Sequence, residues 1–183
     1  MAVILAAGQE AQLAEVRRLR LEGIKAAKDR READAEALYW QALRLHEQIL
    51  GTEDPRVAES LNQIIFFCGI HKSRVEAEPL IQRSLALVRQ NPGPKKRSVL
   101  QTLDMLAIRA QHLGHYEEAE WYYKQVLTAR EEFLEPNHPR MAATLEGYAA
   151  LLREMGRGAE AETLTRRAKA IRQVRYNGEG EPK

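Results

Sequence analysis

Histidine and cysteine are the residue types in this sequence that could bind a metal ion or act as a nucleophile. His112 and His115 lie three residues apart, so both imidazoles could share one helix face, but a zinc site needs a third or fourth ligand. Gly114 between them is expected to end the helix, so we expect no metal site. Cys68 follows Ile64 by one turn at an apolar position, with no histidine placed to activate it, and we therefore expect a buried thiol.

Adjacent glutamates are the other residues that could carry chemistry, as an acid–base pair. Glu117-Glu118 and Glu131-Glu132 instead have the pattern of exposed helix faces. The sequence has no glycine-rich phosphate loop: Pro92-Gly-Pro94 is predicted to be a connector, and the basic run 95–97 a solvated segment. We therefore expect a protein that is not an enzyme and that uses no cofactor.

The composition excludes several classes of protein. Charged residues make up 30% of the chain and apolar residues 44%, which argues against a disordered chain and against a membrane protein. The formal net charge is only +2, and no part of the sequence forms a large basic face, so we expect no nucleic-acid partner. Leu, Ala, Glu, Arg and Gln dominate, and these residues favour helices.

Cysteine usage and the apolar start of the chain bear on its location. The single cysteine excludes an internal disulfide and fits a reducing compartment, so we expect a cytoplasmic protein. The apolar residues 1–7 lack a basic leader and are too short for a signal peptide. No segment is long enough to span a bilayer, so we expect no membrane partner.

A repeat of 42 residues organises the chain. Segments of its first half and of its second half align without gaps when the sequence is shifted by 42 residues. The aligned segments are 50–61, 92–103 and 134–145, then 76–78, 118–120 and 160–162, with 34–36 as a fourth copy at the front. Chance similarity between helices would not hold this register, so the sequence predicts a repeat protein.

Each copy has the pattern of two helices joined by a turn. In the third copy, Leu103, Leu106 and Ala107 recur with a helical period, and a second apolar helix face follows Gly114. A lone helix pair cannot bury its apolar face, whereas stacked pairs can. We therefore predict an all-α fold, an α-solenoid of about four antiparallel helix–turn–helix units.

The expected helix bounds follow from the apolar period and from turn signals. Gly114 and Gly156 lie at matched positions where a positive φ can end a helix, and Asp54-Pro55 and His138-Pro139 place proline near a helix start. We expect helices over 9–29, 32–49, 55–70, 74–90, 96–112, 116–133, 138–154 and 158–175. They form a single array over 1–175 with units of about 9–49, 50–91, 92–133 and 134–175, followed by a flexible tail at 176–183.

The spacing resembles that of tetratricopeptide repeats, in which W-x2-L-G-x2-Y is followed by A-x3-F. The third copy has Leu103-x2-Leu106-Ala107-x2-Ala110 and then Ala119-x3-Tyr123. The 42-residue length and the strings Ser60-Leu-Asn62, Tyr116-Glu-Glu-Ala-Glu120 and Asn137-His-Pro139 are similar to the kinesin-light-chain type of this repeat. The resemblance implies a scaffold that binds a protein or peptide in a concave groove.

The resemblance also implies where that ligand would lie. The first helix of each pair lines the groove, and its inward positions begin one residue after the core leucine. In this sequence the predicted groove residues are Arg20, Ile24, Asn62, Phe66, Asp104, Ile108, Gln111, Glu146 and Arg153, with Arg17, Glu59 and Gln101 at the mouth.

Asn62 has the side chain best suited to hold an extended peptide, since an amide can donate to and accept from its backbone. The matching Asp104 and Glu146 only accept, and a ligand with a basic segment would suit them. Phe66 is expected to project into the groove as an apolar anchor, while Phe67 packs in the core.

Self-association is the alternative function. The predicted helix 158–175 has an apolar side and no capping helix after it, so a second copy could cover that side and form a homo-oligomer. The apolar residues concerned are Ala161, Leu164, Ala168, Ile171 and Val174.

Overall fold

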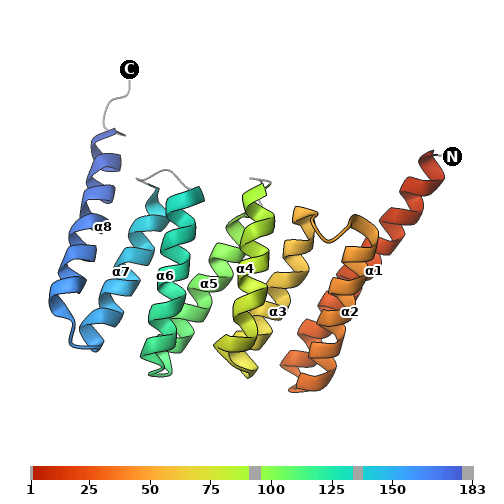
Figure 1. The fold of residues 1–183 in the computed structure, drawn as a ribbon, viewed down its shortest axis with the longest axis horizontal. Helices are drawn as coiled ribbons and strands as arrows, with labels where there is room; N and C mark the ends of the chain where they lie inside the picture. The colour runs from red at the N-terminus through yellow and green to blue at the C-terminus, as the bar shows by residue number, and fades with distance from the viewer. Residues whose placement is uncertain (1, 91–95, 134–137, 179–183) are drawn as a thin grey trace. The chain divides into compact units, whose positions relative to one another are not determined.

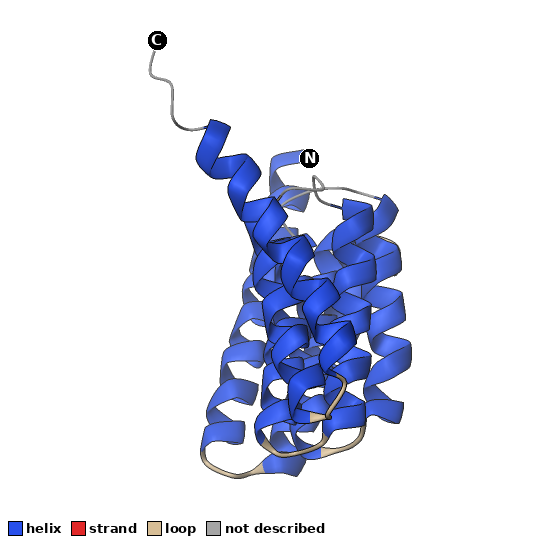
Figure 2. Cartoon of the chain, turned by 90° about the vertical axis from the view of Figure 1, so that its left-hand side faces the viewer, coloured by secondary structure: helices blue, strands red, loops and turns tan. Residues whose placement is uncertain are grey.

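The chain is helical throughout the part that the computed structural model describes, which comprises residues 2–90, 96–133 and 138–178 (Figures 1 and 2). Within these ranges there is no strand. The elements are α1 (Ala2–Lys28), α2 (Glu32–Leu50), the short 3-10 helix η1 (Pro55–Val57), α3 (Ala58–His71), α4 (Arg74–Gln90), α5 (Lys96–His112), α6 (Tyr116–Phe133), α7 (Pro139–Glu154) and α8 (Gly158–Gly178). The all-α class and the helix–turn–helix order are therefore confirmed.

The helix bounds agree with the predicted ones except at the two outer helices and at the start of the third, where the 3-10 helix η1 occupies residues 55–57 before α3 begins at Ala58. α1 begins at Ala2 instead of near residue 9, because its apolar start is rich in alanine and contains no proline. α8 continues to Gly178, so residues 176–178 of the predicted tail are helical. Residues 179–183 and the predicted connector Pro92-Gly-Pro94 lie outside the described residues.

Local signals place the helix ends. The Asp54 carboxylate accepts a hydrogen bond from the Arg56 N–H at 2.8 Å, and the His138 Nδ1 accepts one from the Arg140 N–H at 3.1 Å. In each case a proline follows the capping residue. Gly114 has φ of +76°, and the next N–H reaches back to the Ala110 carbonyl at 2.9 Å, as in a Schellman motif. The predicted turn chemistry is confirmed at these positions.

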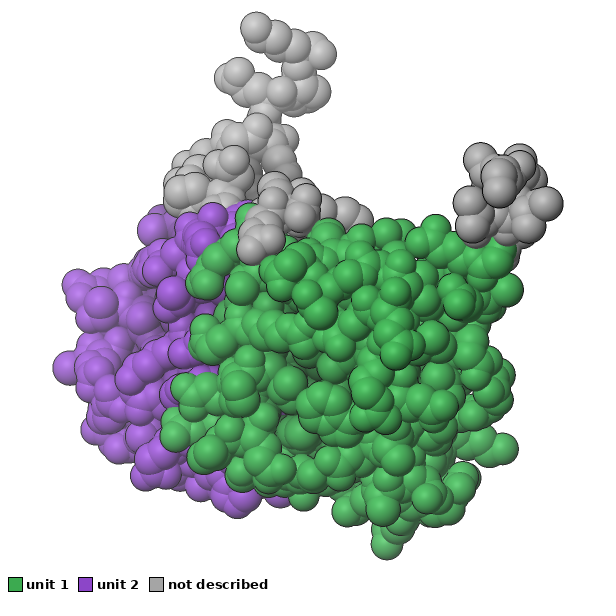
Figure 3. Space-filling model, turned by 45° about the vertical axis from the view of Figure 1, so that its right-hand side comes forward, with its two compact units in different colours: residues 1–99 green, residues 100–183 purple. Residues whose placement is uncertain are grey.

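The helices form two compact units, Met1–Val99 and Leu100–Lys183 (Figure 3). In the first unit α1 packs against α2, α2 against α3, and α3 against α4. In the second unit α6 packs against α7 and α7 against α8, and side-chain hydrogen bonds join α5 to α6. The bounds of the four 42-residue copies stay a prediction.

The aligned leucines form the core, as predicted. Leu61 is buried in the first unit, and Leu103 and Leu145 are buried in the second. Phe67 and Cys68 are also buried. Burial raises the pKa of the Cys68 thiol to about 11, so it stays protonated at neutral pH and is a poor nucleophile.

The apolar side of α8 is not open, which corrects the expectation behind self-association. Ala161, Ala168 and Ile171 are buried, and Leu164 is half-buried, because α8 packs against α7 within the second unit. The side chain of Val174 lies outside the described residues. The described residues that suggested self-association are thus covered by α7, and self-association itself stays a prediction.

Replacing a core leucine tests the register of the helix faces. Leu103 is 0% exposed, so Leu103→Ala should lower the free energy of unfolding by about 2–5 kcal/mol, measured by urea denaturation. Leu113, which is 55% exposed, is the matched control, and Leu113→Ala should cost about 0.5 kcal/mol or less. A loss below about 1 kcal/mol for Leu103→Ala would show that the register is wrong.

Candidate functional site

An open pocket of about 290 Å³ lies within the second unit and is bounded by α5, α6 and α7. Its walls combine polar side chains with a short apolar stretch. The lining residues are Gln101, Asp104 and Ile108 of α5, Tyr123 and Arg130 of α6, and Arg140, Ala143, Thr144 and Gly147 of α7. Three of the residues expected at the groove from the sequence, Gln101, Asp104 and Ile108, thus lie together on one wall.

A polar network forms part of the lining of this pocket, in which the buried Arg130 Nε has no hydrogen-bond partner among the described residues. The Arg130 guanidinium, only 2% exposed, forms a bidentate ion pair with the Asp104 carboxylate and donates to the Arg140 carbonyl at 3.0 Å. The Thr144 hydroxyl donates to the same carboxylate at 3.1 Å. Burial raises the pKa of Asp104, although Arg130 and Thr144 partly offset this effect. The charge of Asp104 is therefore already balanced inside the protein.

The remaining wall is apolar and open to solvent. Ile108 on α5 is 47% exposed, and Ala143 on α7 is exposed. Arg140 adds a positive charge to the lining, and this charge acts on Asp104 without forming a salt bridge to it. The pocket thus presents an apolar surface next to an exposed cation.

Tyr123 forms the inner wall and is held from two sides. Its hydroxyl donates to Gln111 Oε1 at 3.0 Å, and Gln111 Nε2 donates to Glu154 at 2.7 Å. Its ring stacks on that of Tyr148, with centroids 5.7 Å apart and planes 14° from parallel. Burial, together with the nearby carboxylates of Asp104 and Glu154, raises the pKa of Tyr123 to about 12. The tyrosine is therefore a fixed, neutral donor.

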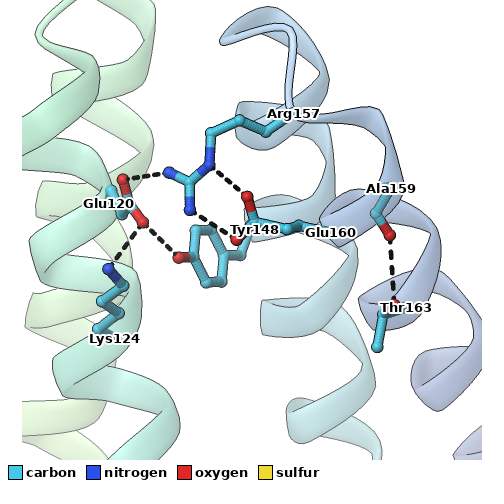
Figure 4. Close-up of polar contacts among 7 residues, drawn as sticks. All are labelled: Glu120, Lys124, Tyr148, Arg157, Ala159, Glu160 and Thr163. Atoms are coloured by element: carbon cyan, nitrogen blue, oxygen red, sulfur yellow. Dashed lines mark hydrogen bonds and ion pairs between the residues drawn. The ribbon is translucent and has the colours of Figure 1, made fainter.

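Tyr148 is in turn anchored by a network that joins α6, α7 and the start of α8 (Figure 4). The Tyr148 hydroxyl donates to Glu120 at 2.7 Å, and Lys124 and Arg157 each contact the same carboxylate at 2.7 Å. Arg157 also pairs with Glu160 in the first turn of α8. Burial alone would raise the pKa of Glu120, but hydrogen bonds from Lys124, Tyr148 and Arg157 outweigh it and lower the pKa to about 2.

Comparison with known proteins identifies the family. Family models described as tetratricopeptide repeat match residues 72–132 and 110–174, and also residues 27–56. The chain belongs to the tetratricopeptide repeat (TPR) family. The kinesin-light-chain type of its repeats, expected from their 42-residue length, stays a prediction.

Solved structures agree with the TPR fold. BtubC (BKLC) from P. vanneervenii has a TM-score of 0.59 at 18% identity, over 92% of this chain and 67% of that chain. The nearly identical TPR-like repeats of a kinesin light chain from Podosopora anserina have a TM-score of 0.58 at 21% identity, over 88% of this chain and 77% of that chain. No curated protein sequence matches this chain. At these identities the likeness concerns the fold alone.

In the first unit of the TPR protein, Asn62 differs most from its expected role. Its side chain is only 3% exposed, its Nδ2 donates to the Ser98 hydroxyl at 2.9 Å, and its Oδ1 accepts from the Ser84 hydroxyl at 3.2 Å. The amide therefore joins α3 to α4 and α5 and offers no free atoms to a peptide. Asn62 thus packs between helices, whereas its position in the repeat predicted that it would lie in the groove.

The other predicted groove residues of the first unit are partly covered. Arg20 pairs with Glu59 at 2.9 Å, which joins α1 to α3. Ile24 and Phe66 are half-buried, so Phe66 is neither a core residue nor a fully exposed anchor. A ligand-binding role for these residues stays a prediction.

In the second unit, Gln111, Glu146 and Arg153 also hold helices together. Glu146 forms a two-bond ion pair with Arg172 of α8 at 2.6 and 2.7 Å, and Arg153 donates to Thr165 of α8 at 2.7 Å. Gln111 orients Tyr123, as described above. None of these three side chains is among the residues that line the pocket.

Sequence reasoning overlooked six lining residues, those of α6 and α7. One signal was present: Arg130 follows Asp104 by 26 residues, and Arg172 follows Glu146 by the same interval. An acid and an arginine that recur together in a 42-residue repeat indicate a pair between the two helices of one copy. The overlooked residues are Tyr123, Arg130, Arg140, Ala143, Thr144 and Gly147.

Neither a metal site nor a membrane span emerges from the part of the chain that the structure describes. Within residues 2–90, 96–133 and 138–178, no three His, Cys, Asp or Glu side chains gather around one point. In the same ranges, no helix combines the length and the apolar character needed to cross a bilayer.

The network around Glu120 predicts a pH dependence of stability. A carboxylate whose folded pKa is about 2 instead of about 4.5 stabilises the fold above about pH 4.5 and loses this effect as the pH falls toward 2. The melting temperature of the wild type should therefore fall more steeply from about pH 5 to pH 2 than that of Glu120→Gln. Glu117→Gln, on the exposed face of the same helix, should follow the wild type, whereas equal slopes for wild type and Glu120→Gln would contradict the network.

Proposed function

We propose that this TPR protein is a non-enzymatic scaffold that holds a short extended segment of a partner protein in the pocket between α5, α6 and α7. TPR arrays are generally protein-interaction scaffolds, which supports the general class. The observation that carries the proposal is the exposed Ile108 beside a pocket in which the Asp104 carboxylate is already paired with Arg130. That the chain has no enzymatic activity remains part of the proposal.

The size and openness of the pocket favour a peptide over a small metabolite. Its volume of about 290 Å³ lies at the lower end of the range for ligand sites, about 300–1,000 Å³. Such a space holds one large side chain, while the rest of an extended segment would run over α5 and α7. Ile108 and Ala143 offer apolar contact from opposite walls.

The charges favour an apolar side chain flanked by a carboxylate. Arg130 balances Asp104, and Arg172 balances Glu146, so a basic segment would meet no unpaired acid at these two positions. Arg140 is the charge at the rim that a ligand could still neutralise. A segment with a carboxylate beside an apolar side chain therefore suits this pocket better than the basic segment expected from the sequence.

Peptide selection followed by substitution at the pocket tests the proposal. A random peptide display library is selected on the wild-type protein, and the enriched peptide is synthesised with a fluorescent label. Its affinity should fall about tenfold or more, or about 1.4 kcal/mol or more, for Ile108→Asp, because the apolar wall is lost. The matched control is Leu21→Asp, an exposed helical leucine in the first unit, which should bind as the wild type does.

The charge of the ligand is tested with the same peptide. Replacing its acidic residue by the corresponding amide should weaken binding to the wild type but not to Arg140→Ala. Failure to enrich any peptide, or binding that is equally strong in Ile108→Asp, would contradict the proposed function.

A further inference from the structure

We infer that Gly147 sets the depth of the pocket by leaving room for the Tyr123 ring, so that position 147 determines which side chains the pocket admits. The effect of position 147 on ligand choice rests on the proposed function, whereas the close approach of Gly147 to Tyr123 does not. A Cβ atom added at Gly147 would lie 2.9 Å from the Tyr123 hydroxyl oxygen, 3.2 Å from Cε1 and 3.3 Å from Cζ. The first distance is too short for a carbon–oxygen contact, so any larger residue must displace Tyr123 or α7.

Tyr123 has little freedom to yield. The side chain is buried, its hydroxyl is fixed by Gln111, and its ring is stacked on Tyr148. Gln111 is itself held by Glu154, and Tyr148 by Glu120. Since both Gly147 and Tyr123 line the pocket, an added methyl group reduces its volume directly and again through the displaced ring.

The repeat register shows that this glycine is special to the last copy. Position 147 corresponds to Met105, Gln63 and Leu21 at successive intervals of 42 residues, and all three have large side chains. Only the α7 copy therefore leaves space at this position for an aromatic ring from the preceding copy. A residue of the type found at this position in the other copies would place a long side chain in the pocket.

A second tyrosine at the same register also packs against a glycine, but in a different helix pairing. Tyr39 precedes Tyr123 by 84 residues, twice the repeat. A Cβ atom added at Gly23 would lie within 2.8 Å of two ring carbons of Tyr39. Gly23 belongs to α1 of the same helix pair as Tyr39, whereas Gly147 belongs to the pair after that of Tyr123. The arrangement of Gly147 and Tyr123 is therefore the one in which both residues line the pocket.

A double-mutant cycle tests the inference with the selected peptide. In the wild-type background, Gly147→Ala should weaken binding about tenfold or more. In a Tyr123→Phe background the same substitution should weaken binding less than about threefold relative to Tyr123→Phe itself, because removing the hydroxyl removes the 2.9 Å contact and frees the ring from Gln111. Wild-type affinity in Gly147→Ala, or an equal loss in both backgrounds, would overturn the inference.

The control substitution is Gly158→Ala in α8, where an added Cβ has no atom within 4 Å. It should leave both binding and folding unchanged. Alanine favours a helix more than glycine does, so a loss of binding in Gly147→Ala cannot come from a weaker helix. Thermal unfolding of each variant verifies that the fold is kept.

A measurement without ligand separates this inference from the proposed function. In NMR spectra of the free protein, the Tyr123 ring protons and the Ile108 methyl groups should shift in Gly147→Ala and not in Gly158→Ala. If these signals shift but no variant binds a peptide, the result would support the contact between Gly147 and Tyr123 and contradict the proposed function. Unchanged spectra would overturn the inference whatever the peptide does.

Discussion

Stacking of helix pairs through a buried leucine every 42 residues is the constraint on which the rest of the structure depends. Leu61, Leu103 and Leu145 are fully buried, and a single helix pair could not shield any of them from water. Burying an aliphatic side chain of this size is worth about 1.5–3 kcal/mol, so the helices must keep this register. Every other position on the first helix of a pair then either packs against a neighbouring helix or is exposed to solvent.

Polar residues that pack against a neighbouring helix need hydrogen-bond partners inside the protein, and these bonds determine the polar part of the pocket lining. Arg130 is buried, and a buried charge is tolerated only when it is paired and hydrogen-bonded. Asp104 and the Arg140 carbonyl bind its two terminal nitrogens, and the Thr144 hydroxyl holds the Asp104 carboxylate, while the buried Arg130 Nε has no hydrogen-bond partner among the described residues. Because the Asp104 charge is balanced in this way, the surface proposed for a ligand is the apolar wall around Ile108 and the guanidinium of Arg140.

Residue order alone was sufficient for the helices, the turns at Gly114 and Gly156 and the buried leucines, because helical periodicity and capping act over a few residues and the repeat supplies the register. It was insufficient for the pocket. Whether Asn62 faces a ligand or Ser84 and Ser98 depends on side chains more than 20 residues away, and a helix-face argument cannot distinguish a stacking position from an open one. The space beside Tyr123 likewise exists only because packing places Gly147 against its ring.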